Sequence, residues 1–403
     1  MTKIWDLKGV SPLFRIPSSV LFAHKEKENI KRNLPTSGID GVSYEGVLPL
    51  HNCKYYVAKD LLKETSSKWY FAKQGKSSAF STRKYKVQTL VNPYKDEFRQ
   101  GATIVPRSFY FVELTQELPP DYDERIINIK TADAIKHDAK PPWKSLELSG
   151  RIESKFLFRT ALSKSILPFA LFKPDLAVLP ITIELDESNQ KKILLHSADD
   201  LMGDGYLHAS RWFKNVENFW KIYRTENNKN MSSENYLNWH NKLVKQNLNA
   251  PYLVLYNSSA INANATIVIR KEINLEFIVE SKGYAFETDN LHEGYYLVSI
   301  LNSAIPNALM KDFQSRGLWG ARDVHKKILD IYFPKYNEED ETHKRLADIS
   351  KAAHQKGALY LATNPPKEEL TATRLGRLRV EIKKHLSPDM KEIDKIVKKL
   401  IDN

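Results

Sequence analysis

Residues 294–334 constrain the fold of this chain more than any other stretch, because apolar, glycine and proline positions follow one another in a fixed order. Apolar residues first recur at helical spacing, which predicts a helix with one buried face; they are Leu297, Ile300, Leu301, Ala304, Ala308 and Leu309. Pro306 is expected to kink this helix. Gly317 and Gly320 then allow a tight turn, and LDIYFP, ending at Pro334, is typical of a short strand.

The loop of this helix–loop–strand unit carries cationic side chains around one tryptophan. The candidate DNA-binding residues are Arg316, Trp319, Arg322, Lys326 and Lys327. Cations held between rigid elements suit a phosphate backbone, so we expect contacts to DNA here. The alternative is an intramolecular role, with Arg322 paired to Asp323 or Asp312 and Trp319 packed in the core.

A second candidate site is a pair of arginines in residues 92–114. Arg99 precedes the apolar run ATIV, and Arg107 follows the break at Pro106, before SFYFVEL. Both runs favour strands. We expect Arg99 or Arg107 to reach DNA, where a guanidinium can pair bidentately with guanine. The alternative for Arg107 is a strand-end position with its stem over apolar neighbours and its charge in water.

The charge balance favours a polyanionic partner. The chain of 403 residues has 61 Lys and Arg against 49 Asp and Glu, which gives a net charge of +12. We expect this partner to be nucleic acid, ahead of a membrane surface. Cys53 is the single cysteine, which excludes a disulfide within the chain and a cysteine-built zinc site. No apolar run is long enough for a membrane helix, so we expect a soluble cytoplasmic protein.

The remaining pattern predicts an α+β fold with a β-rich part and a C-terminal helical region. Residues 251–288 favour a meander of four strands, and residues 210–223 carry an aromatic stripe typical of a buried helix face. Three amphipathic helices are expected after residue 337. We divide the chain into a strand and hairpin segment (1–50), a β-rich domain (51–290) and a helical region (291–403) containing the basic loop 314–327.

Motifs for chemistry are incomplete. Adenine methylation needs a glycine-bearing cofactor turn and an Asn/Asp-Pro-Pro-aromatic loop that holds the flipped base. Asn364-Pro365-Pro366 is followed by Lys367, so the stacking ring is missing. The run at 140–143, KPPW, has the ring but a lysine where the amine acceptor must stand. We therefore expect no catalytic residues, no metal and no cofactor in this chain, and no methyl transfer by the chain alone.

Several blocks resemble, in order, the post-catalytic part of N6-adenine DNA methyltransferases of restriction-modification systems, in particular the large type II restriction-methylase-like enzymes. The blocks are FRIPSSVLFA, GVLP, FRQGATIVPRSFYFVEL, KPPWKSLELSGRIESKFLFRTALS and the 294–334 stretch. FRIPSSVLFA is similar to the end strands of the catalytic sheet, and the other blocks are similar to the target-recognition region.

This resemblance implies a β-rich target-recognition domain that binds double-stranded DNA. It also implies a partner catalytic subunit that carries S-adenosylmethionine, because the catalytic loops are missing here. The chain would then be the recognition half of a split enzyme or the remnant of a truncated gene. A different class stays open: a non-catalytic protein-interaction scaffold of a phage-defence system. FRIPSSVLFA is apolar enough to be buried on both faces, and we expect it to dock on the edge of the sheet of this partner subunit.

Overall fold

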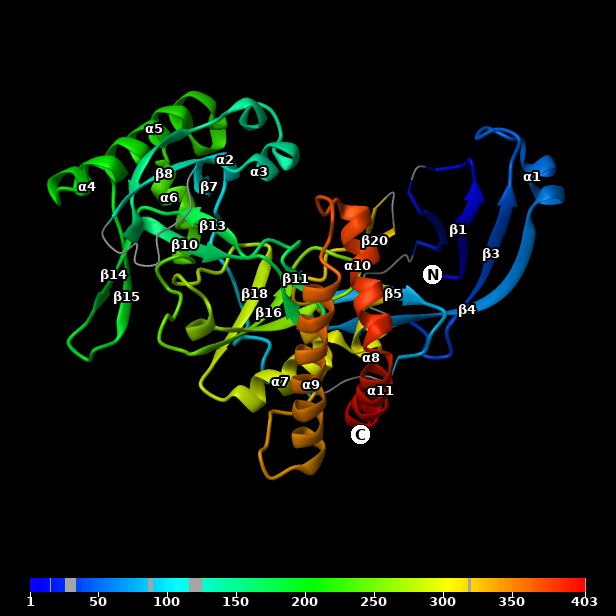
Figure 1. Cartoon of the computed structure of the whole chain (residues 1–403). Helices are drawn as coiled ribbons and strands as arrows, with labels where there is room; N and C mark the ends of the chain where they lie inside the picture. Colours follow the sequence, from blue (N-terminus) through cyan, green and yellow to red (C-terminus); the bar gives the residue numbers. More distant parts are fainter. Residues whose placement is uncertain (15, 26–33, 86–89, 116–124, 318–319, 403) are drawn as a thin grey trace.

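The computed structural model describes residues 1–403 except 15, 26–33, 86–89, 116–124, 318–319 and 403. It has an α+β fold, as predicted, in which separate sheets carry helices on their faces. Figure 1 shows three units: an N-terminal sheet at the right, a lobe at the upper left and a central unit with the C-terminal helices between them. The two larger units have their own extensive apolar cores.

The N-terminal sheet has the strand order β2-β1-β3-β4-β5, and only the β1–β3 pair is parallel. Its elements are β1 (Lys3–Ser11), β2 (Ser19–Phe22), β3 (Ile39–Val47), α1 (Tyr55–Leu61), β4 (Lys63–Gln74) and β5 (Ser77–Ser81). Its core is small, formed by Ile4, Ile39 and Trp69 with two partly buried neighbours. Pairs between β3 and β4 join residues on both sides of position 50, so the predicted boundary falls inside this sheet.

In the isolated chain, residues 13–23 do not form a strand buried on both faces, and their burial against a partner subunit stays a prediction. Among the described residues of this stretch, Ser19–Phe22 form a strand, which pairs antiparallel with β1 of the same chain and occupies the edge of the sheet. Leu21 is 50% exposed and Ile16 is 56% exposed. An apolar run cannot reveal whether its faces have neighbours, and here Val20 and Leu21, which point to opposite faces of β2, are both exposed.

The lobe contains a five-stranded sheet of order β10-β13-β7-β8-β9. The strands of this sheet are β7 (Phe111–Leu114), β8 (Ile126–Thr131), β9 (Ser149–Glu153), β10 (Leu157–Thr160) and β13 (Asp175–Val178). The lobe also contains a separate hairpin of β14 (Ile181–Leu185) and β15 (Lys191–Leu195). Its helices are α2 (Arg107–Tyr110), α3 (Asp133–Asp138), α4 (Ala198–Gly203), α5 (Leu207–Tyr223) and α6 (Ser233–Leu237), with the 3-10 turns η1 (Trp143–Ser145), η2 (Ser154–Phe156), η3 (Glu226–Asn228) and η4 (Trp239–Asn241). The aromatic stripe of α5 is buried in the lobe core, as predicted.

The central unit has a four-stranded sheet of order β17-β16-β18-β6. Its strands are β6 (Arg99–Gln100), β16 (Tyr252–Asn257), β17 (Ala265–Ile269) and β18 (Gly283–Thr288), with the small pairs β11 (Ile166–Leu167) and β12 (Ala170–Leu171), and β19 (Ser315–Gly317) and β20 (Gly320–Arg322). Its helices are α7 (Leu291–Asn302), α8 (Ala304–Leu309), α9 (Glu341–Thr363), α10 (Ala372–His385) and α11 (Ser387–Asp402), with η5 (Arg270–Glu272), η6 (Lys311–Phe313) and η7 (Lys327–Asp330). Helix α7 packs on β16 and β17, and α9 packs on α7.

Most of the lobe lies between β6 and β16 of the central sheet, and the pair β11–β12 of the same stretch returns to pack on β17. Gly101 stands where the chain leaves β6. A Cβ at this position would lie 2.3 Å from the carbonyl oxygen of Val279, so the close approach of two backbones requires glycine here. The next residue, Ala102, bridges to Glu280.

Several predicted strands are wrong, whereas the three C-terminal helices are confirmed. ATIV forms only the isolated bridge at Ala102, and SFYFVEL begins with the helical turn α2 before β7. LDIYFP is a 3-10 turn followed by irregular chain, and the meander has three strands, since residues 275–281 form isolated bridges instead of a fourth. The helix break lies at Ser303, which caps α8, and Pro306 sits in the first turn of α8, where its missing N–H is tolerated.

Among the described residues, no helix combines the length and apolar composition needed to cross a membrane.

Candidate nucleic-acid interface

Four cations from three distant parts of the chain meet at β6, the edge of the central sheet. We call Lys95, Arg99, Lys242 and Lys326 the edge cluster. The Lys326 amine donates to the carbonyl oxygen of Lys95 at 2.7 Å, and the Lys242 amine donates to Oε1 of Gln100, beside Arg99, at 2.8 Å. Partial burial lowers the pKa of Lys326, and the charges of Lys95 and Arg99 lower it further against the opposing effect of Asp96.

Local structure explains why these residues meet. Strand β6 pairs with β18 through Gln100 and Arg99, which places the exposed Arg99 on the outer strand of the sheet. Lys326 follows His325, whose carbonyl oxygen accepts from the Tyr256 hydroxyl at 2.7 Å. The backbone before Lys326 is therefore anchored to β16, and its side chain extends toward β6. The structure thus brings together two predicted site residues, Arg99 and Lys326.

Carboxylates near the edge cluster offset part of its charge. Asp330 forms an ion pair with Lys95. Glu287 accepts from the backbone N–H of Asn247 at 3.1 Å, and burial raises its pKa although Arg99 and Arg270 lower it. Asp96 is exposed. Arg99, Lys242 and Lys326 therefore supply the positive charge that this edge presents.

The other predicted site residues have different surroundings. Arg107 is half-buried in the first turn of α2 rather than at a strand end, and its charge lowers the pKa of Glu280 against the larger raising effect of burial. The Lys327 amine donates to the carbonyl oxygen of Phe313 at 2.5 Å, which ties two segments of the chain together. Asp312, considered as a partner of Arg322, accepts from the hydroxyls of Ser81 at 2.6 Å and Tyr85 at 2.7 Å.

The backbones of Arg316 and Arg322 belong to the hairpin β19–β20, in which Arg316 pairs with Ala321 and Arg322 pairs with Ser315. Their side chains lie outside the described part of the structure, and Trp319 lies outside the described residues altogether. Their predicted contacts with DNA stay predictions.

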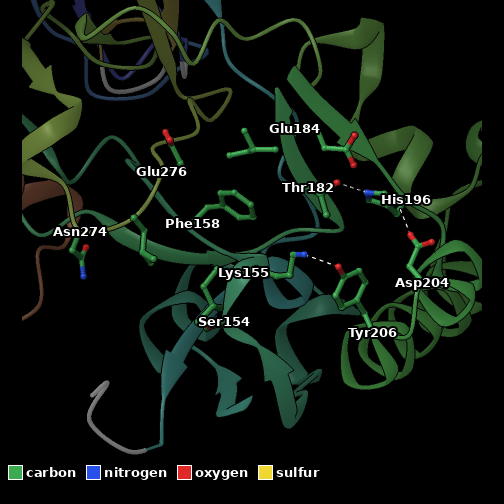
Figure 2. Close-up of a pocket in the computed structure, with 13 residues that line it drawn as sticks. Ser154, Lys155, Phe158, Thr182, Glu184, His196, Asp204, Tyr206, Asn274 and Glu276 are labelled. Atoms are coloured by element: carbon green, nitrogen blue, oxygen red, sulfur yellow. Dashed lines mark hydrogen bonds and ion pairs between the residues drawn. The ribbon is translucent and has the colours of Figure 1, made fainter. Parts of the chain in front are cut away.

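A separate hollow lies on the lobe. It is a cavity of about 840 Å³ lined by η2, β10, β14, the segment after α4 and residues 274–276. Figure 2 shows two hydrogen-bonded pairs on its wall. The Lys155 amine is 2.6 Å from the Tyr206 hydroxyl, and Thr182 Oγ1 is 2.7 Å from Nε2 of His196.

The row Thr182–His196–Asp204 in this cavity does not have the geometry of a nucleophile activated by histidine. Nδ1 of His196 is 3.9 Å from Asp204 Oδ2, which is too long for the hydrogen bond that orients the imidazole in such a group. Thr182 is 9% exposed, so its hydroxyl serves the contact between β14 and the chain after β15. We infer that these side chains stabilise the fold.

The charge of the cavity also argues against binding phosphate. Glu184, Asp204 and Glu276 line it against Lys155 alone, and Glu276 is already paired with Lys191. No sequence motif predicts this cavity, because its lining residues are spread over residues 154–276. Within the described residues, no group of three or more His, Cys, Asp or Glu side chains is arranged to hold a metal ion.

The two segments that partly match the Asn/Asp-Pro-Pro-aromatic motif have structural surroundings in this chain. Pro365 and Pro366 lie in the connection between α9 and α10. Trp143, at the start of η1, packs its ring at 5.4 Å from that of Phe109 and at 6.2 Å from that of Trp220. Its ring is therefore engaged in the lobe.

Comparisons with known proteins give a structural similarity without a sequence match. No protein-family model and no curated protein matches the chain. A solved structure of the type IIL restriction-modification enzyme MmeI in complex with DNA is similar over 90% of this chain, with a TM-score of 0.48 and 12% sequence identity. The match covers 38% of the MmeI chain, so this protein spans well under half the length of that enzyme.

Proposed function

We propose that this chain binds double-stranded DNA and supplies sequence recognition to a site-specific adenine-N6 DNA methyltransferase of a restriction-modification or phage-defence system. The edge cluster is the observation that carries DNA binding. It brings Lys242 and Lys326 close to Arg99 on the outer strand of a sheet, in a chain of net charge +12. The resemblance of the 98–114 and 294–334 segments to target-recognition regions supports the methyltransferase context.

The physical basis of binding is electrostatic. Cations that neutralise DNA phosphates release condensed counterions, so affinity falls steeply as salt is added. Phosphate contacts of this kind set the position of the protein on the duplex and carry no sequence information themselves. Lys242 and Lys326 are suited to this role because neutral protein oxygens hold their amines in place, which reduces the conformational freedom lost on binding.

A gel-shift titration of the full chain with a mixed-sequence duplex tests this proposal. We expect binding at low salt and an affinity that falls several-fold or more at physiological salt. The absence of any shift at low salt would contradict DNA binding.

The catalytic function is assigned to a partner subunit that carries S-adenosylmethionine and the adenine-binding loop. Both partly matching segments of this chain depart from the pattern that adenine binding needs. Isothermal calorimetry of the purified chain should therefore detect no S-adenosylmethionine binding. Clear micromolar binding of S-adenosylmethionine would contradict the assignment of cofactor binding to a partner subunit.

The N-terminal sheet is the surface we assign to that partner subunit. Its edge strand β2 is apolar, and Phe14, Ile16 and Leu21 are each at least half exposed. An exposed apolar edge is a template for pairing with another chain. Hydrogen exchange at residues 19–22 should slow when the catalytic subunit is added. Exchange that is equally slow in the isolated chain would contradict docking through β2.

The exposed apolar side chains of this sheet also favour a second function, a non-catalytic protein-interaction scaffold of a defence system. The two functions differ in the duplex titration. A scaffold docks proteins through the N-terminal sheet and shows no salt-sensitive DNA binding, whereas a DNA-recognition subunit shows both.

A further inference from the structure

One turn beside the edge cluster combines a disfavoured backbone with an exposed surface. The turn 238–242, which contains η4, follows α6 and ends at Lys242. His240 (φ 57°) and Asn241 (φ 59°) both adopt the left-handed conformation. Two consecutive non-glycine residues of this kind are uncommon, and such a conformation persists only where the surroundings hold it.

Hydrogen bonds and two buried leucines fix the conformation of the turn. Oδ1 of Asn238 accepts from the backbone N–H groups of Leu243 and Val244, both at 3.2 Å. The N–H of Asn241 donates to the carbonyl oxygen of Asn238 at 2.7 Å. Leu237 and Leu243, which flank the turn, are fully buried. The turn is therefore a rigid projection.

The side chains that this projection presents are suited to a nucleic-acid surface. Trp239 is 40% exposed, and His240 and Asn241 are exposed. The ring of Trp239 lies 4.8 Å from that of His240 and 6.4 Å from that of Tyr236, which packs on Trp220 of α5. An imidazole and a carboxamide can each donate and accept hydrogen bonds at base edges.

The position of the turn relates it to the cations. Lys242 is the last residue of the turn and a member of the edge cluster, and its amine is bonded to Gln100 next to Arg99. Farther along the same segment, Gln246 exchanges hydrogen bonds with the backbone of Val279 at 2.8 and 2.9 Å. The turn and the edge of the central sheet are thus one connected surface.

We propose that the turn 238–242 determines sequence specificity: His240 and Asn241 contact base edges in a groove of a DNA duplex whose backbone lies on the edge cluster. This inference rests on the DNA binding proposed above. It adds an element that reads sequence to cations that only position the duplex. The tip of a rigid turn is narrow enough to enter a major groove about 12 Å wide.

The test is selection from a pool of random duplexes by the full chain and by the variant His240→Gly/Asn241→Gly. Glycine adopts the left-handed conformation freely, so the variant keeps the backbone and loses both polar side chains. A second variant, His240→Asn, keeps a residue that tolerates this conformation. Lys245→Ala, an exposed lysine beyond the turn, is the matched control.

We expect the wild-type chain and the control to enrich a common motif. The double-glycine variant should lose at least about tenfold in preference for that motif over a scrambled duplex, with an unchanged salt dependence. His240→Asn should alter or weaken the motif at some positions and leave the others intact.

Three results would overturn the inference, and they separate it from the proposed function. An unchanged motif in both turn variants contradicts a role of the turn in reading sequence, while DNA binding stands. A wild-type chain that binds all duplexes equally contradicts specificity, and DNA binding again stands. A wild-type chain that binds no duplex contradicts both proposals.

Discussion

The edge cluster and the lobe cavity each present a lysine held by a neutral hydrogen-bond acceptor, yet their surroundings differ in charge. Lys242 is held by Gln100, with Arg99 and Lys326 nearby. Lys155 is held by Tyr206 (Figure 2), but three carboxylates share its cavity. The cavity is hollowed, with a volume of about 840 Å³, and the edge is the feature with an excess of cations.

The difference shows that the presence of a hollow is a poor guide to a polyanion site. A DNA duplex is a wide, convex and strongly negative ligand, and its contacts are mostly to phosphates on the surface. A sheet edge with anchored cations meets these demands, whereas a lobe cavity with an excess of carboxylates repels phosphate.

Charge reversal should have the largest effect. The variant Arg99→Glu/Lys242→Glu replaces two attractions with two repulsions, so its affinity for a mixed-sequence duplex at low salt should fall by more than about tenfold. The matched control is Lys155→Glu in the cavity, which should change affinity by less than about twofold. Fluorescence anisotropy measures the DNA affinity of both variants. An equal loss of affinity in the two would contradict a difference between the edge cluster and the cavity.

Two adjacent lysines should separate a DNA contact from a fold contact. We expect Lys326→Ala to weaken binding to all duplexes about equally and to reduce the log–log salt slope by roughly one unit. Lys327→Ala removes the bond to the Phe313 carbonyl and should lower stability by about 1–3 kcal/mol, since a charged donor is lost. Its salt slope should stay unchanged. Thermal melts and salt titrations of both variants measure these effects. A smaller salt slope for Lys327→Ala and a loss of stability for Lys326→Ala would contradict the roles assigned here.

The smallest effect should be a pH dependence that belongs to Lys326. Its pKa in the folded chain lies below the ordinary 10.5, because burial disfavours the charged form. As pH rises through this lowered pKa, Lys326 loses its proton before ordinary lysines do. The decrease of DNA affinity with rising pH should therefore begin at a lower pH than ordinary lysines would give. Lys326→Arg keeps the charge and should remove this early fall. Identical pH profiles for wild type and Lys326→Arg would show that Lys326 does not contact DNA.

Part of this arrangement was predictable from the sequence. Helical periodicity correctly gave the buried stripe of α5 and the C-terminal helices, because each pattern extends over several turns. Arg99 and Lys326 were both predicted as DNA-binding residues, but nothing local showed that the two lie near each other. Their proximity depends on the pairing of β6 with β18 and on the anchoring of residue 325 by Tyr256.

The failed predictions have tertiary causes. The run ATIV has strand-forming residues, but it follows Gly101, where the chain approaches the backbone of Val279 and crosses to the lobe. Lys242 lies in a polar segment between elements, and no spacing marks it as a partner of Gln100. Local propensity does not indicate such long-range pairings. The edge cluster depends on them.

The most direct test of the central claim is the salt dependence of DNA binding by the full chain and by Arg99→Ala/Lys242→Ala. We predict a linear fall of log affinity with log salt for the wild type and a slope smaller in magnitude by roughly two units for the variant. Lys155→Ala should retain the wild-type slope. Equal slopes for the wild type and the double variant, at equal thermal stability, would contradict the assignment of DNA binding to the edge cluster.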